Sequence, residues 1–292
     1  MNFPVTKLVT DSSTPALTVP PGSFVAIRFG LAGLAFSPLL ARSEDLGKTL
    51  RAGAEVGIYL ALGYVSQAVG LVTEGAGEAG FLCSLQVVFV TLVGAVRKGG
   101  ITFREGLSAM LAVAGVGVLE GIGGGMELGP GFWLLMLQPF MFGMSYLRIE
   151  KYMKSTDSLS FTASQLIFTA LFAGIYSVVG EGGVEGLAGS FGGIVGDGWL
   201  SPQALAVAYT AVFGTIISIA LETEALKHVS PRETSVVLTT EPLIAGLGGA
   251  WLLHEQFQGW LGAALILGAS AVTFLPAFGG EGGEGGGGET GE

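Results

Sequence analysis

The residues of chemical interest are polar side chains inside long apolar runs. They are Glu241, Gln86, Gln67, Glu222, Tyr64, Arg28 and Gln165. Glu241 precedes Pro242, which has no N–H group and so frees the carbonyl of Leu238 from a helical hydrogen bond. A carboxylate at membrane depth costs about 2.5–3.5 kcal/mol, so it should face a cavity or a partner. Two interpretations remain open. Glu241 contacts a solute or exchanges a proton, or it is a structural carboxyl bonded to the neighbouring hydroxyls of Thr239 or Thr240.

The amide and carboxylate groups in other apolar runs have two interpretations as well. Gln67 and Gln86 either line a polar cavity or bond one helix to the next. Tyr64 precedes Gln67 by three residues, so the two side chains can share one helical face. Glu222 either lines the same cavity or is solvated, because it lies near the end of its apolar run beside Glu224.

Arg28 and Gln165 occupy corresponding places in the two halves of the chain. Arg28 lies seven residues into its apolar run and either snorkels to the membrane interface or attracts an anionic solute. Gln165 corresponds to it because Ala163-Ser164-Gln165-Leu166 aligns with Ala26-Ile27-Arg28-Phe29.

Motifs for enzymatic chemistry are incomplete. Gly47-Lys48-Thr49 ends like a phosphate-binding loop, but Arg42 stands where the first glycine is needed. His254-Glu255 lacks the second histidine of a zinc-protease helix, and Gly143-Met144-Ser145-Tyr146-Leu147 lacks the closing glycine of a serine-nucleophile turn. The chain has two histidines and one cysteine. The sequence therefore predicts no enzyme, no metal site and no cofactor.

The composition is that of an integral membrane protein. Of 292 residues, 50% are hydrophobic and only 12% are charged, with a mean hydropathy of +0.66. A soluble domain carries about 25% charged residues. The lipid bilayer is therefore one partner, and the scattered basic residues predict no binding of nucleic acid.

Nine apolar runs are long enough to span a membrane, which predicts an all-α, multi-pass bundle. They are Gly22 to Ala41, Ala52 to Val72, Ala79 to Val96, Gly106 to Gly121, Pro130 to Ile149, Phe161 to Gly180, Ala204 to Leu221, Thr234 to Leu253 and Phe257 to Phe278. The glycine-rich stretch Glu181 to Ser201 is expected to be a flexible loop. The Gly/Glu tail, residues 279–292, is expected to be disordered.

The basic residues predict the orientation. If the connections alternate between the two sides, eleven of the thirteen Lys and Arg residues fall on one side, which is then cytosolic or stromal. This places the short apolar fragment Met1 to Val9 on the opposite side. The fragment covers roughly half of the hydrocarbon layer, so we expect it to be the second half of an incomplete first helix.

An internal repeat relates the two halves of the chain. A shift of 155 residues aligns apolar runs and pairs Gln67 with Glu222 and Gln86 with Glu241. The matched connections lie on opposite sides of the membrane, so the repeat is inverted, as in many secondary transporters. Inversion needs an odd number of helices per repeat. The prediction is a 5+5 architecture, with repeats over residues 1–121 and 130–278.

Several motifs resemble those of the EamA-type members of the drug/metabolite transporter superfamily. Asn2 to Leu8 resembles the end of the family's first helix, and Arg28-Phe29 resembles a motif of its second. Lys227 to Arg232, followed by Glu241-Pro242-Leu243, resembles the signature of its ninth helix. His254-Glu255 stands where the family usually has Gly-Glu. The resemblance implies ten helices, permease activity on small metabolites and a central cavity between the repeats.

The leading hypothesis is thus a secondary transporter of a small organic metabolite. A sugar-phosphate-type translocator would need more cavity bases than Lys7 and Arg28. A non-transporting scaffold derived from a permease and an intramembrane enzyme are the other hypotheses, and the missing motifs count against the enzyme. Proton coupling, a homodimer, and the choice between plasma membrane and plastid envelope stay open.

Overall fold

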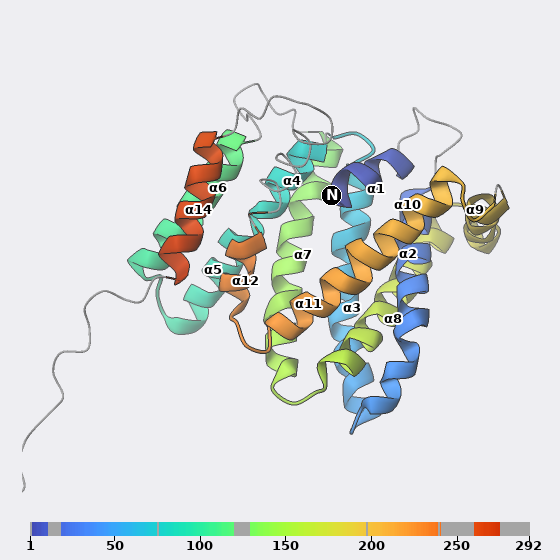
Figure 1. Cartoon of the computed structure of the whole chain (residues 1–292), viewed down its shortest axis with the longest axis horizontal. Coiled ribbons are helices and arrows are strands. Elements are labelled where there is room, and N and C mark those ends of the chain that lie inside the picture. Colours follow the sequence, from blue (N-terminus) through green and yellow to red (C-terminus); the bar gives the residue numbers. More distant parts are fainter. Residues whose placement is uncertain are drawn as a thin grey trace, which may run out of the picture.

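The computed structural model describes residues 2–10, 19–74, 76–119, 129–196, 198–238, 240 and 260–274. The regular elements in these ranges are all helices (Figure 1). They are α1 (Asn2–Thr10), α2 (Pro21–Phe36), η1 (Ser37–Arg42), α3 (Leu46–Gly70), α4 (Ala76–Ser84), α5 (Gln86–Lys98), α6 (Phe103–Leu119), α7 (Pro130–Met153), α8 (Ser158–Gly180), α9 (Gly183–Gly196), α10 (Pro202–Ala211), η2 (Val212–Ile217), α11 (Ser218–Ala225), α12 (Pro231–Leu238) and α14 (Trp260–Phe274).

Long apolar helices confirm the predicted class of an all-α membrane protein. Within the described ranges, three helical stretches are both long and apolar enough to cross a bilayer: Pro21–Arg42, Ser158–Gly180 and Pro202–Ala225. The last of these joins α10, η2 and α11 into one rod, drawn in orange (Figure 1). The count of nine spans stays a prediction, since most of the expected helix Thr234 to Leu253 lies outside the described residues.

The prediction of a flexible loop over Glu181 to Ser201 is wrong, because α9 occupies most of this stretch. Glycines with positive φ flank the helix. Gly182 precedes it with a φ of 101°, Gly183 begins it with 75°, and Gly198 follows it with 94°. Inside the helix, Ile194 is buried and Leu187 packs against the same core cluster. Burial of this apolar face outweighs the weak helix propensity of the glycines.

Two expected continuous helices are interrupted. The run Ala79 to Val96 is divided into α4 and α5 at Leu85, whose N–H bonds to the carbonyl of Leu82 in a tight turn. The run Ala204 to Leu221 contains the π-helical turn η2. The hydroxyls of Thr215 and Ser218 donate to carbonyls five residues back, those of Thr210 and Phe213, at 3.0 and 2.8 Å. Such π-turns rotate the following residues about the helix axis.

Glycines on α3 allow this helix to pack closely on two neighbours. On one side, a Cβ on Gly53 would lie 2.5 Å from the Cβ of Ser164, and one on Gly57 would lie 2.7 Å from the Cβ of Phe168, both on α8. On another side, Gly63 faces a residue of α7, the ring of Phe142. Small residues let transmembrane helices approach to backbone contact. This packing places α3 between α7 and α8, at the centre of the bundle.

Polar contacts tie the helix ends together at both ends of the bundle. At one end, the carboxylate of Glu181, directly after α8, accepts hydrogen bonds from the backbone N–H groups of Gly22 and Ser23 at 2.7 and 2.8 Å. A negative charge is favourable at the N-terminus of α2. At the other end, the ammonium of Lys48 donates to the carbonyl of Ser155, joining the α2–α3 and α7–α8 connections.

Candidate functional site

Arg28 lies inside the bundle among aromatic rings. Its side chain is 1% exposed, and its guanidinium carbon is 4.9 Å from the ring centre of Tyr64, 5.1 Å from Phe29 and 5.9 Å from Phe24. A desolvated guanidinium gains about 2 kcal/mol from a well-placed aromatic face. The snorkelling interpretation therefore does not describe this arrangement, because the rings hold the cation within the protein.

Tyr64 connects Arg28 to the middle of α7. Its ring centre is 4.8 Å from that of Phe29 on α2 and 4.7 Å from that of Phe142 on α7, both in tilted geometry. Gly63, the residue before it, leaves the room that the Phe142 ring occupies. Three helices, α2, α3 and α7, thus meet at one tyrosine ring.

Glu222 is held by a tyrosine and is not merely solvated. The hydroxyl of Tyr146, one helical turn beyond Phe142, donates to Oε2 of Glu222 at 2.9 Å. The next residue, Thr223, accepts a hydrogen bond at 2.8 Å from the amide nitrogen of Gln165, which is fully buried on α8. Since both residues of α11 follow η2, the π-turn helps to set their direction towards α7 and α8.

The other two predicted glutamines are also buried, and Gln86 lies beside a helix interruption. Gln67 on α3 is 2% exposed and Gln86 is 5% exposed. Gln86 begins α5 directly after the turn at Leu85, and within the described part of the chain its amide nitrogen has no hydrogen-bond partner. Discontinuous helices with free polar groups are typical of solute sites in transporters. Glu241 lies outside the described residues.

Two residues that sequence reasoning missed belong to the same region, Tyr146 and Gln138. Gln138 is fully buried on α7. A signal for it was present, because Gln138-Pro139 repeats, in another apolar run, the pattern of a polar residue before proline that singled out Glu241. Tyr146 carried no such signal, since only the fold brings it to Glu222.

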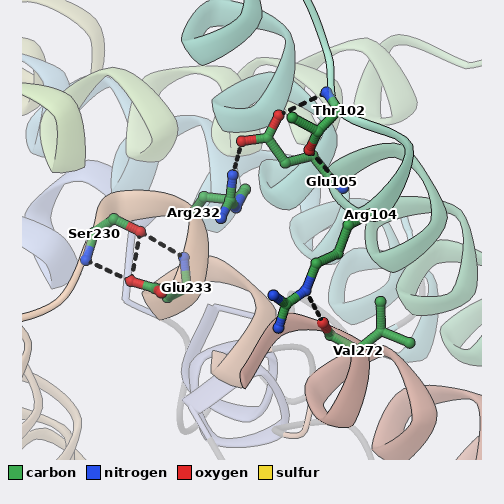
Figure 2. A network of polar contacts seen from close by, with 7 residues as sticks. All are labelled: Thr102, Arg104, Glu105, Ser230, Arg232, Glu233 and Val272. Atoms are coloured by element: carbon green, nitrogen blue, oxygen red, sulfur yellow. Dashed lines mark hydrogen bonds and ion pairs between the residues drawn. The ribbon is translucent and has the colours of Figure 1, made fainter. Parts of the chain in front are cut away.

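A second polar cluster joins α6, α12 and α14 (Figure 2). Glu105 pairs with Arg232, and Arg104 donates to the carbonyl of Val272. Helix α6 begins with a reciprocal capping arrangement, in which Thr102 N–H donates to Glu105 and Glu105 N–H donates to the Thr102 hydroxyl.

Helix α12 begins in the same way, with Ser230 and Glu233 as the reciprocal pair. Burial raises the pKa of the Glu233 carboxyl. The hydrogen bonds from the Ser230 side chain and backbone, with the charges of Arg232 and Arg104, outweigh burial and leave this pKa below its ordinary value. The carboxylate therefore stays ionised, and the start of α12 is firmly capped.

Comparison with known proteins assigns the chain to a family. The model of the EamA-like transporter family matches residues 8–120 and 129–275. The chain belongs to the EamA-like transporter family. It is also similar to an "Uncharacterized transporter" of Archaeoglobus fulgidus, at 28% identity over 280 residues, which is 94% of this chain and 81% of the relative. This EamA protein is therefore an integral membrane transporter of the drug/metabolite transporter superfamily and not an enzyme.

A solved crystal structure shares the fold of this EamA chain. It superposes with a TM-score of 0.69 at 19% sequence identity, and the match covers 94% of each chain. At this level of identity the likeness concerns the arrangement of the helices alone. The arrangement of Arg28, Tyr64, Tyr146 and Glu222 is thus described from this chain's own contacts.

Proposed function

We propose that this chain is a secondary transporter that moves a small organic metabolite by alternating access between two inverted repeats. The observation that carries the proposal is the line of contacts from Arg28 through Tyr64 and Phe142 to Tyr146 and Glu222. It connects α2 and α3 of the first half to α7 and α11 of the second. A solute bound along this line would contact both halves, as a rocking mechanism requires.

The inverted repeat is supported by helix breaks at matched positions. The shift of 155 residues pairs Leu85, the turn between α4 and α5, with Thr240, which forms a turn after α12 ends at Leu238. We propose that Gln86 and Glu241, the next matched pair, line the solute pathway from opposite halves. Gln67 and Gln165 are proposed as further lining residues.

The charges on the site favour a metabolite transporter over a sugar-phosphate-type translocator. A phosphate group needs several convergent cations. Arg28 is enclosed by three rings, and the ammonium of Lys7 donates to the carbonyls of Leu71 and Glu74 at the end of α3. Neither base is arranged with the other around a common position.

The polar cluster of Figure 2 is suited to closing the solute pathway at one side of the membrane. Glu105 and Arg232 join α6 of the first half to α12 of the second, so their separation would let the halves move apart at this end. We propose that this end faces the cytosol, because it carries most of the basic residues.

The orientation is tested by labelling. With Cys83→Ser, the chain has no native cysteine left. We expect a membrane-impermeant maleimide to label Val184→Cys, on exposed α9, in intact cells. Glu44→Cys, in the exposed α2–α3 connection, should react only after permeabilisation. Labelling of Glu44→Cys from outside would reverse the proposed orientation.

Transport is tested by exchange in proteoliposomes. Vesicles preloaded with amino acids, sugars, nucleosides and carboxylic acids should take up the labelled form of at least one of them faster than empty vesicles. The Tyr64→Leu variant should lower this rate about tenfold, since the tilted ring contacts and the cation–π contact of Tyr64 together contribute more than about 1.4 kcal/mol. Tyr209→Leu is the matched control, because Tyr209 lies exposed on α10. Folded protein that exchanges no solute would favour the scaffold hypothesis.

A further inference from the structure

We propose that Gln67 and Gln138 form an amide pair that binds an uncharged hydroxyl or carboxamide group of the solute. The inference rests on the proposed transport function and names the class of solute. It starts from a buried polar group without a partner: Gln138 is 0% exposed, and within the described residues neither its amide nitrogen nor its amide oxygen has a hydrogen-bond partner. Native proteins rarely leave both ends of a buried amide unpaired unless another molecule completes them.

Helix packing places Gln138 at the level of Gln67. A Cβ on Gly70 would lie 2.7 Å from Leu135, and one on Gly63 would lie 2.4 Å from the ring of Phe142, so α3 and α7 run antiparallel in close contact. Gln138 lies three residues after Leu135 and four before Phe142, on the same face of α7. Gln67 lies in the same way between Gly63 and Gly70, on the same face of α3. The two amides therefore occupy the same layer of the bundle.

Proline adds an acceptor in this layer. Pro139 lies inside α7 and cannot donate a hydrogen bond, so the carbonyl of Leu135 loses its helical partner. The layer thus offers the Gln138 amide, which can both donate and accept, and a backbone carbonyl that accepts. One helical turn away, the tilted rings of Tyr64 and Phe142 provide an apolar surface. A solute with a ring or an apolar body and a hydrogen-bonding group fits both layers.

The charges near this position favour an uncharged solute. Among the described residues of the site, the cation Arg28 contacts three aromatic rings, and the carboxylate Glu222 accepts from Tyr146. Within the described part of the chain, the amide atoms of the site that lack a hydrogen-bond partner belong to neutral side chains, Gln86, Gln165 and Gln138, and only in Gln138 are both ends of the amide unpaired. An ionic group of the solute would lose its hydration on entering this layer and would meet no opposite charge there, at a large desolvation cost. Hydroxyl and carboxamide groups would find partners there without that cost.

The first experiment measures the thermal stability of purified protein without solute. If the amide of Gln138 is reserved for a ligand, Gln138→Met removes an unpaired buried group at similar volume and should raise the apparent Tm. Gln165→Met is the matched comparison, because Gln165 is equally buried but donates to Thr223, and its Tm should fall. A Tm that falls for Gln138→Met as well, or a variant that does not fold, would show a structural role and overturn the assignment of Gln138.

The second experiment compares probes that differ in charge. The pairs are nicotinamide with nicotinate, uridine with uridine 5′-monophosphate, and glucose with glucose 6-phosphate. We expect the uncharged member of at least one pair to raise the Tm of the wild-type chain more than its charged partner, and Gln138→Met to lose this shift. Stronger stabilisation by the charged members, or none by any member, would overturn the solute class. A probe that binds but is not exchanged in proteoliposomes would instead contradict the proposed transport function.

Discussion

We expect Gly53→Ala to lower the free energy of unfolding by about 1–3 kcal/mol, the usual cost of forcing extra volume into a packed contact. The added Cβ would lie 2.0 Å from the Oγ of Ser164, 2.5 Å from its Cβ and 2.8 Å from its carbonyl carbon. Because backbone is among these atoms, a rotamer change cannot make room. The helices α3 and α8 must separate, and the hydrogen bond from Ser164 to the Thr49 carbonyl would be strained. Denaturation in mixed detergent micelles measures the change.

Gly30→Ala is the control for this substitution. Gly30 also lies inside a helix, but a Cβ there would have no atom within 4 Å. Alanine has a better helix propensity than glycine by about 1 kcal/mol, so this variant should be as stable as the wild type or slightly more stable. Equal stability of the two variants would mean that the α3–α8 contact is looser than the structure describes.

We expect Glu222→Gln to lower solute exchange at least tenfold while the protein stays folded. Glutamine keeps an oxygen that can accept the hydrogen bond from Tyr146, so the change isolates the loss of the negative charge. Tyr146→Phe makes the complementary change, since it keeps the charge and removes the donor. Tyr146→Phe loses a hydrogen bond to a charged group, about 1.5–3 kcal/mol, which corresponds to roughly tenfold or more, and Glu222→Gln replaces that bond by a weaker, neutral one. Exchange rates in proteoliposomes, with thermal stability measured in parallel, separate activity from folding.

Glu224→Gln is the matched control for the charge at Glu222. Glu224 lies two residues along the same helix, is half-exposed, and bonds to Ser158 and His228 at the end of the bundle. Its replacement should leave exchange near the wild-type rate. If Glu222→Gln is equally active, Glu222 only anchors Tyr146, and the solute pathway follows other residues of the site.

The helix pattern of this chain was predictable as far as hydrophobicity determines it. Length and apolar composition decide whether a segment enters a bilayer, and α2, α8 and the rod from α10 to α11 follow from them. Helix α9 was not predictable in this way. Its glycine-rich sequence predicts a loop by propensity, and only the burial of Ile194 and Leu187 against the core makes it a helix.

The candidate site, like the helix pattern, was predictable from the sequence only in part. Charged and amide groups in apolar runs must be functional or paired, so the sequence alone singled out Arg28 and Glu222. It could not identify the partners of these residues. The Tyr64 ring beside Arg28 and the Tyr146 hydroxyl at Glu222 come from other helices, and their approach depends on the close α3–α7 contact at Gly63 and on the π-turn η2.

The sequence by itself determined that this is a multi-pass membrane protein of the EamA-like family, because solvation of side chains and motif order are local properties. Only the tertiary structure decided which polar groups meet. Tyr146 joins Glu222, Gln165 joins Thr223, and within the described part of the chain the amide of Gln138 stays unpaired. The physical reason is that hydrogen bonds and ring contacts act over a few ångströms. They depend on helix crossing, rotation and register, which no single segment encodes.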